Sequence, residues 1–306
     1  MPIVSTSTSA FFERARRDMS SLRSQAEDLQ AQLGNGQRLS RSSDDPVAAS
    51  RLRALQRLEQ LSTIDTTNAN RANADLSLAD GAMSSIADTI IRAKELALQA
   101  SNGTLTDTQR ASIGQELEAI GGNLLALANT RDSSGHALFG GESAGDAYAL
   151  DASGSAVYVG TGTSGELPLG EGQSVTRSLT GPEFLNFSVK GQPTDLLAVV
   201  NSLAAALQGG ASDPAAAASD AVASLSAGLD SVTTAQTVIG ARLSWIDLTT
   251  QRRTDLSELR TNEETTIGST DIAATVTQLQ QTMLVLEASQ ASFNKLASLT
   301  LFNQLN

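Results

Sequence analysis

The sequence predicts a mainly α-helical protein, in which long coiled-coil helical arms from both ends of the chain flank a small β-rich inserted head domain. Three observations predict this fold. Apolar residues recur in alternating steps of three and four in four stretches of the chain. No Phe, Tyr or Trp occurs between Glu13 and Leu138. Residues 135–191, by contrast, contain 12 of the 24 glycines and both tyrosines.

The apolar repeats are typical of helices that pack along a narrow seam without rings in the core. The longest repeat comprises Ala69, Ala72, Leu76, Ala79, Met83, Ile86, Ile90, Ala93, Ala97 and Ala100. A second comprises Ile113, Leu117, Ile120, Leu124 and Leu127.

The two ends of the chain carry matching repeats. The N-terminal one comprises Met19, Leu22, Ala26, Leu29 and Leu33. The C-terminal one comprises Ile272, Val276, Leu279, Met283, Leu286, Gln290, Phe293 and Ala297. Because neither end can bury its seam alone, we expect the chain to fold back so that the two ends pack together. We interpret these positions as an assembly seam.

A turn motif is expected between the first two helices. Gly34 and Gly36 should end the first helix by supplying a left-handed residue. Asp45 should cap the second helix, with Pro46 at its first position. Asp44 and Asp45 could also be read as catalytic carboxylates or a cation site, but adjacent side chains at a helix start do not converge on one substrate. Capping is the main reading, and a contact between subunits remains open for the pair.

The sequence also predicts where other helices begin and end. The Asn102-Gly103 pair should break the long helix, and Thr106 with Gln109 forms a capping box for the next one. Asp213 followed by Pro214 repeats the cap-plus-proline start, and Gly268 marks a late break.

The expected domain organisation has three parts. Residues 1–44 pair with 269–306 as an inner terminal coiled-coil segment, and residues 45–132 pack with 194–268 as a helical-bundle rod. Residues 133–193 form the Gly-rich β head, and a short helix at about 195–207 leads back into the arms.

Composition excludes several kinds of protein. A net charge of −12, from 33 acidic and 21 basic residues, disfavours a nucleic-acid partner. There is no cysteine and His136 is the only histidine, so no common zinc site can form, and the sequence shows no partnered Ser/His nucleophile. No stretch approaches a membrane span, and the N-terminus lacks the layout of a cleaved signal peptide. We expect no enzyme activity, no metal and no cofactor.

Six blocks carry a resemblance to one family. They are Leu33–Leu39 with Ser43–Ser50, Arg92–Leu105, Leu127–Asn129, Gly135–Gly141, Val238–Leu243 and Lys295–Phe302. In this order, and with the Asp-Asp-Pro-Val-Ala-Ala form at Asp44–Ala49, they resemble the hook–filament junction proteins (hook-associated protein 3) of the flagellin-related superfamily.

The resemblance implies a structural subunit of the bacterial flagellum, an adaptor that joins the hook to the flagellin filament. Its implied partners are further copies of itself in a ring, hook-associated protein 1, flagellin, and an export chaperone of the flagellar type III system. Its implied location is extracellular, at the hook–filament junction, after export without a cleaved signal peptide. A flagellin that forms the filament itself is the nearest alternative, and a secreted coiled-coil adhesin or effector is a more remote one.

The last segment of the chain is unusually poor in charge. From Asp271 onward it carries only Asp271, Glu287 and Lys295. A solvated surface helix normally carries more. This favours either a partly buried helix in a bundle or, given the resemblance, a neutral lining for a tube through which unfolded chains slide.

Overall fold

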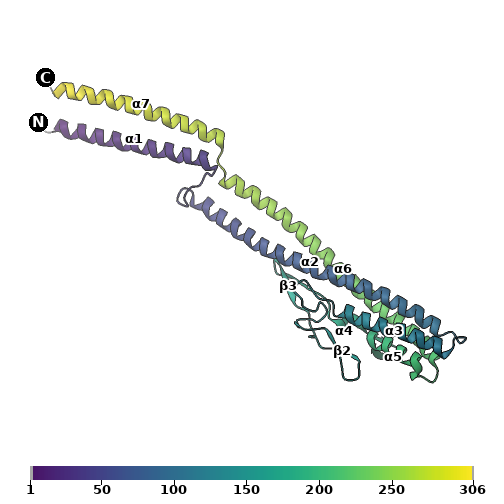
Figure 1. Cartoon of the computed structure of the whole chain (residues 1–306). Coiled ribbons are helices and arrows are strands. Elements are labelled where there is room, and N and C mark those ends of the chain that lie inside the picture. The colour runs from purple at the N-terminus through teal and green to yellow at the C-terminus, as the bar shows by residue number, and fades with distance from the viewer. Residues whose placement is uncertain (1–2, 305–306) are drawn as a thin grey trace. The chain divides into compact units, whose positions relative to one another are not determined.

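The computed structural model describes residues 3–304 (Figure 1), and the side chains of residues 9–298. The described residues form two compact units. Unit 1 comprises the described residues up to 60 and from 255 onward, and unit 2 comprises residues 61–254. The helices are α1 (Ile3–Asn35), α2 (Pro46–Ala100), α3 (Asp107–Ala128), α4 (Gly181–Leu185), α5 (Leu196–Ala205), α6 (Pro214–Gly268) and α7 (Ile272–Gln304), with a π-helical turn η1 (Ala206–Gly210) after α5. The helical arms and the inserted head confirm the predicted fold class.

Unit 1 is built from two helix pairs. Helices α1 and α7 pack along each other, and the rings of Phe12 and Phe293 meet edge to face with centroids 5.3 Å apart. The first turns of α2 lie against the last turns of α6. There the Arg51 guanidinium donates from Nε and Nη2 to the Glu263 carboxylate at 2.6 and 2.8 Å. The expectation that the two ends of the chain pack together is confirmed.

The core of unit 2 follows the longest apolar repeat. All ten members of the predicted seam in residues 69–100 are buried, with at most 1% of the residue surface exposed. Ile113, Leu117 and Leu124 of the next repeat are buried as well, and Ile120 and Leu127 are half-buried. A seam of alanines lets the helix backbones approach closely, which explains how this core forms without aromatic rings.

The predicted helix ends are confirmed. α2 ends at Ala100, before Asn102, and α3 starts after Thr106 with both halves of the capping box in place. α6 begins at Pro214, where the Asp213 carboxylate accepts the Ala216 N–H at 3.0 Å. The same helix ends at Gly268.

The head lies between α3 and α5 and contains three two-stranded antiparallel sheets. They pair β1 (Tyr148–Leu150) with β2 (Ala156–Tyr158), β3 (Glu166–Gly170) with β4 (Gln173–Thr176), and β5 (Asn186–Val189) with β6 (Gln192–Asp195). The last two hairpins turn through Glu171-Gly172 and Lys190-Gly191, in which all four residues have positive φ, as a tight primed turn requires.

A buried ion cluster ties the head to the helices of unit 2. Arg177 donates to the Asp75 carboxylate of α2 at 2.8 and 2.9 Å and to the Asp132 carboxylate at 2.8 Å. Both carboxylate side chains are 3% exposed and the guanidinium side chain is 27% exposed. Burial alone would raise the pKa of Asp132. Hydrogen bonds from the N–H groups of His136 and Ser134, together with Arg177, outweigh burial and hold that pKa below its usual value.

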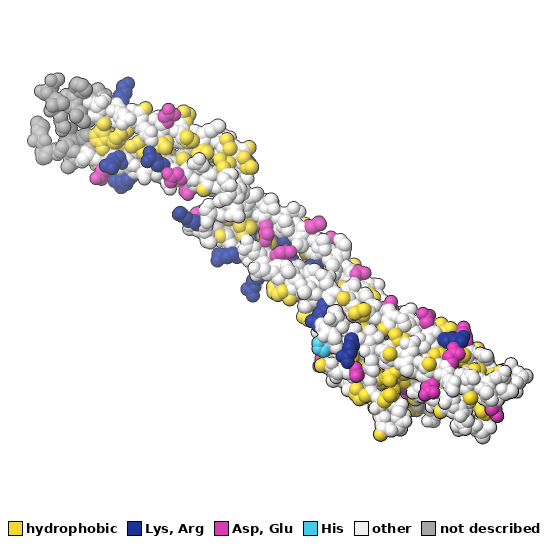
Figure 2. Space-filling view, in the orientation of Figure 1, with side chains coloured by type: hydrophobic (Ala, Val, Ile, Leu, Met, Phe, Trp, Pro, Cys, Tyr) yellow, Lys and Arg dark blue, Asp and Glu magenta, His cyan; other side chains and the backbone are white. Residues whose placement is uncertain are grey.

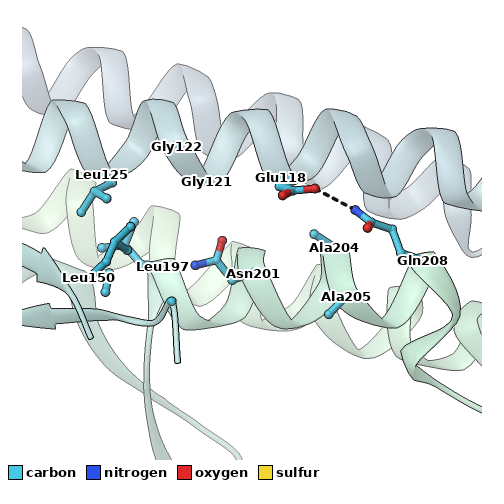
Figure 3. A pocket seen from close by; sticks show the side chains of 12 residues that line it. Glu118, Gly121, Gly122, Leu125, Leu150, Leu197, Asn201, Ala204, Ala205 and Gln208 are labelled. Carbon is cyan, nitrogen blue, oxygen red and sulfur yellow. Dashed lines mark hydrogen bonds between the residues drawn. The ribbon is translucent and has the colours of Figure 1, made fainter. Parts of the chain in front are cut away.

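Helix α3 packs closely on α5 because two of its residues are glycines. A Cβ on Gly114 would lie 2.9 Å from the Ala204 carbonyl oxygen, and one on Gly121 would lie 2.5 Å from the Asn201 amide oxygen. Beside them is a cleft of about 350 Å³, in which the Asn201 side chain points from α5 toward α3 (Figure 3).

The division into two compact units does not test the three-part domain division that the sequence predicts. The three-part division stays a prediction.

Candidate assembly site

The α1/α7 pair and the turn that follows α1 hold the residues that the sequence assigns to assembly. On α1 the members of the predicted seam face α7. Leu29 is 7% exposed, and Met19, Leu22 and Leu33 are half-buried. These seam residues thus pack against α7, but most of them are only partly buried, since two helices alone cover each other on one side only.

On α7 the members of the predicted assembly seam differ in how far α1 covers them. Leu279, Leu286 and Phe293 are half-buried against α1, as expected. Ile272, Val276 and Met283 are exposed, at 65%, 37% and 57%.

The positions that α7 buries in their place are small and polar. Thr275 is 8% exposed and Thr282 is 7% exposed. The Thr282 hydroxyl donates to the Gln278 carbonyl at 2.8 Å, so it satisfies its own helix and leaves a methyl group for the seam. A search for apolar periodicity passes over such threonines and picks the apolar residue next to each of them.

The turn after α1 depends on Gly36. This residue has a φ of +71°, and its N–H donates to the Gln32 carbonyl at 2.9 Å, which ends the helix. Gly34 has no such role, because it lies inside α1 and nothing lies within 4 Å of where its Cβ would be. The expectation that both glycines supply the left-handed residue is therefore wrong for Gly34.

The chain then pairs with the segment between α6 and α7. Gln37 forms an antiparallel bridge with Ser269, and the Arg38 N–H donates to the Gly268 carbonyl at 2.8 Å. The Thr270 N–H donates to the Gly36 carbonyl at 3.0 Å. These bonds fix the point at which the two terminal helices begin to run together.

Asp44 and Asp45 have different partners. Asp44 accepts the N–H groups of Ser40 and Arg41, at 3.2 and 2.7 Å, and so closes the turn. Asp45 accepts the Ala48 N–H at 3.0 Å, as a cap of α2, with Pro46 at the first helical position.

The charge state of Asp45 follows from this cap. The Ala48 N–H bond lowers the pKa of the Asp45 carboxyl; partial desolvation opposes the shift, and the Arg38 guanidinium, 3.4 Å away, adds to it. The two carboxylates serve the turn and the helix start separately, and they do not converge on a common point.

Exposed apolar side chains remain on α7 after it has packed against α1. They are Ile272, Val276, Met283, Leu284, Val285 and Leu296. Figure 2 shows apolar side chains along the middle of this helix pair and charged ones toward α1. Within the described part of α7 the charges are Glu287 and Lys295. The pair is thus an incomplete bundle, with an apolar, nearly neutral surface beside a charged one.

His136 lies elsewhere, in a loop of unit 2. Its N–H donates to the Asp132 carboxylate at 2.9 Å, in a turn that the Ser134 N–H also stabilises. In the part of the chain that the structure describes, no cluster of three His, Cys, Asp or Glu side chains is arranged to hold a metal ion. Among the helices of residues 3–304, none is long and apolar enough to cross a membrane.

Two features of the site escaped sequence reasoning. The Asp271 carboxylate caps α7 by accepting the Ala274 N–H at 3.0 Å. The sequence carries a signal for this cap, since an Asp directly before the first residue of an apolar repeat, here Ile272, marks a helix start. Arg38, which donates through Nε to the Ile267 carbonyl at 3.1 Å, carries no such signal because its partner is 229 residues away.

Comparison with known proteins agrees with this architecture. Residues 5–144 match the model of the bacterial flagellin N-terminal helical region. The flagellar hook-associated protein 3 of Escherichia coli is 26% identical over 97% of this chain and 98% of its own length. Polar flagellin F of Vibrio parahaemolyticus is 28% identical, over 47% of this chain and 39% of its own. A crystal structure of hook-associated protein 3 from Legionella pneumophila superposes with a TM-score of 0.61 at 16% identity, over 75% of this chain and 99% of that one.

The chain thus combines paired terminal helices, a helical core and an inserted head with an N-terminal region that matches the flagellin model. The match with the Escherichia coli hook-associated protein 3 covers nearly the whole chain, whereas polar flagellin F aligns over about half of it. Over nearly its whole length, the chain is thus similar to a flagellar hook-associated protein 3.

Proposed function

We propose that this protein is the structural adaptor that joins the flagellar hook, through hook-associated protein 1, to the flagellin filament. The observation that carries the proposal is the full-length match with hook-associated protein 3, which includes the head as well as the terminal helices. A flagellin is the alternative function, and it is favoured by the N-terminal helical region alone.

The geometry of unit 1 suggests how such an adaptor works. A two-helix pair buries one side of each helix and leaves apolar residues of the predicted seam on α7 exposed, among them Ile272 at 65% and Met283 at 57%. Neighbouring subunits would cover these residues when identical copies assemble around an axis. Assembly would then complete a bundle that the single chain leaves open, and this is the role we assign to the predicted assembly seam.

The scarcity of charge on α7 fits a surface that faces a channel. Fixed charges would bind oppositely charged segments of a chain in transit, whereas Gln, Ser, Thr and Asn side chains would not hold it. We assign the lining of such a channel to α7.

The remaining expectations form part of the same proposal. The protein acts mechanically, without catalysis, metal or cofactor. Its partners are further copies of itself in a ring, hook-associated protein 1, flagellin, and an export chaperone. It is located outside the cell at the junction, which it reaches through the flagellar type III apparatus without a cleaved signal peptide. The support for this part is the similarity to hook-associated protein 3 over nearly the whole chain.

Electron microscopy of flagella labelled with an antibody to the head (residues 133–193) tests the proposal. Label in a single band at the tip of the hook is expected. Label along the whole filament would instead establish the flagellin alternative.

A further inference from the structure

One side of the α1/α7 pair contains a groove with two arginines. It has a volume of about 450 Å³ and is lined by Arg16, Met19, Ser20, Arg23, Gln290, Phe293 and Asn294. Met19 and Phe293 are half-buried, both arginines are exposed, and no acidic residue lines the groove. A surface with this chemistry fits an acidic side chain that has apolar neighbours.

The opposite side of α1 carries a carboxylate of the matching kind. Asp18 is exposed. A helix turns by about 100° per residue, so the directions of Asp18 and Arg16 around the helix axis differ by about 160°, and those of Asp18 and Arg23 by about 140°. Within one chain these groups therefore face apart. Along the helix axis, however, Asp18 lies between them, about 3 Å from the level of Arg16 and about 7.5 Å from that of Arg23.

Helix α7 also carries two residues at similar levels on its two sides, and here both residues are apolar. Met283 lies two turns before Gln290, which lines the groove, so Met283 belongs to the groove side. Val285, two residues further on, points to the other side. Met283 is 57% exposed and Val285 is 50% exposed, and their levels along the axis differ by about 3 Å.

We propose that the partner of this groove is a second copy of the same chain, placed beside the first at nearly the same height, whose Asp18 sits between Arg16 and Arg23. In that register Val285 of the second copy meets Met283 of the first. Both helices thus give the same alignment independently, one through charge and the other through apolar contact. The contact joins unlike sides of two copies, so it repeats from copy to copy and closes into a ring when the rotation permits.

This inference rests on the proposed function for the ring, but its test does not depend on location. The chain has no cysteine, so introduced thiols report one contact each. The experiment uses flagella from cells whose only copy of this protein carries Asp18→Cys and Arg23→Cys together, oxidised and analysed by denaturing gel. The two Cα atoms in one chain are separated by about 7.5 Å along the axis alone, which is too far for an internal disulfide.

A ladder of dimers, trimers and higher species is expected. Each single-cysteine variant should give monomer only, and the matched control pair Asp18→Cys with Ser24→Cys should give a far weaker ladder, because Ser24 points away from the groove. Dimers from Asp18→Cys alone would overturn the inference in favour of a two-fold contact. A double variant that stays monomeric in flagella with attached filaments would overturn it too.

A charge exchange supplies a second, independent readout. Asp18→Arg should impair motility, and combining it with Arg16→Asp and Arg23→Asp should restore motility. Combining it instead with Arg17→Asp, an exposed arginine outside the groove, should not. Equal rescue by both combinations would contradict the pairing. If the ladder forms but antibody labels the whole filament, the contact is supported and the proposed function is wrong. If antibody labels a single band at the hook tip but no ladder forms, the proposed function is supported and the contact is wrong.

Discussion

Replacement of Arg177 by methionine tests how the head is held on the helices of unit 2. Methionine keeps much of the volume and length of the side chain but removes the guanidinium. Its loss would leave the Asp75 and Asp132 carboxylates, both 3% exposed, without the cation that lies 2.8 Å from each of them. An uncompensated buried charge is among the costlier results of a single substitution.

The magnitude follows from what each carboxylate retains. Asp132 still accepts the Ser134 and His136 N–H groups, at 2.8 and 2.9 Å, so its loss is partial. Asp75, in the middle of α2, has no such backbone donors free to it, because the helix uses them. Breaking a buried ion pair costs about 3–5 kcal/mol. We expect a loss in that range, with most of it attributable to Asp75.

Urea unfolding of the full chain measures this loss. Trp245, the only tryptophan, packs against the core of unit 2 and reports its unfolding by fluorescence. Arg131→Met is the matched control. Arg131 pairs with Asp146, but both side chains are about half exposed, so its loss should cost less than about 1 kcal/mol. Adding Asp75→Asn to Arg177→Met should recover part of the stability. If the two arginine variants agree within about 1 kcal/mol, the reasoning is refuted.

Three further predictions concern packing, the seam and pH. Gly114→Ala should lower the free energy of unfolding by about 1–3 kcal/mol in the same assay, because its Cβ would meet the Ala204 carbonyl. Gly122→Ala should raise it by up to about 1 kcal/mol, because nothing lies within 4 Å of the new Cβ. Equal effects would contradict the packing argument. Leu279→Asp with Leu286→Asp should abolish filament attachment yet leave the Trp245 transition unchanged; motile cells would show that the seam is wrongly assigned. The pKa of Asp132 is lowered in the folded protein, so its ionised form stabilises the fold above a pH of about 4, and this stabilisation is lost on acidification. Stability of the Asp132→Asn variant should therefore fall less steeply than that of the unchanged protein between about pH 5 and pH 2. An unchanged slope would refute this.

The sequence predicts the helices of this fold well because their signals are local. Alanine and leucine at steps of three and four specify the α2 seam, and every one of its ten members is buried. Thr106 with Gln109, and Asp45 with Pro46, mark helix starts through hydrogen bonds within four residues. Such features require no knowledge of distant parts of the chain.

The features that sequence reasoning missed depend on distant partners or on atypical residues. Arg177 meets Asp75 across 102 positions, and no periodic pattern connects them. Thr275 and Thr282 occupy the α7 seam because a threonine can bond its own helix and still bury a methyl group, while Val276 and Met283 remain exposed. The charge relation of Asp18 to Arg16 and Arg23 becomes visible only once the groove shows which side of α1 the arginines occupy.

Deletion of the gene tests the central claim most directly. Flagellin subunits need a template that presents the right lattice of helix ends, because short helix seams are not stable in water without neighbours. If this chain supplies that template, the deletion strain should have intact hooks, no attached filaments, and flagellin monomers free in the medium, as seen by electron microscopy and by gels of shed protein. Filaments that remain attached to the hooks of the deletion strain would contradict the junction role.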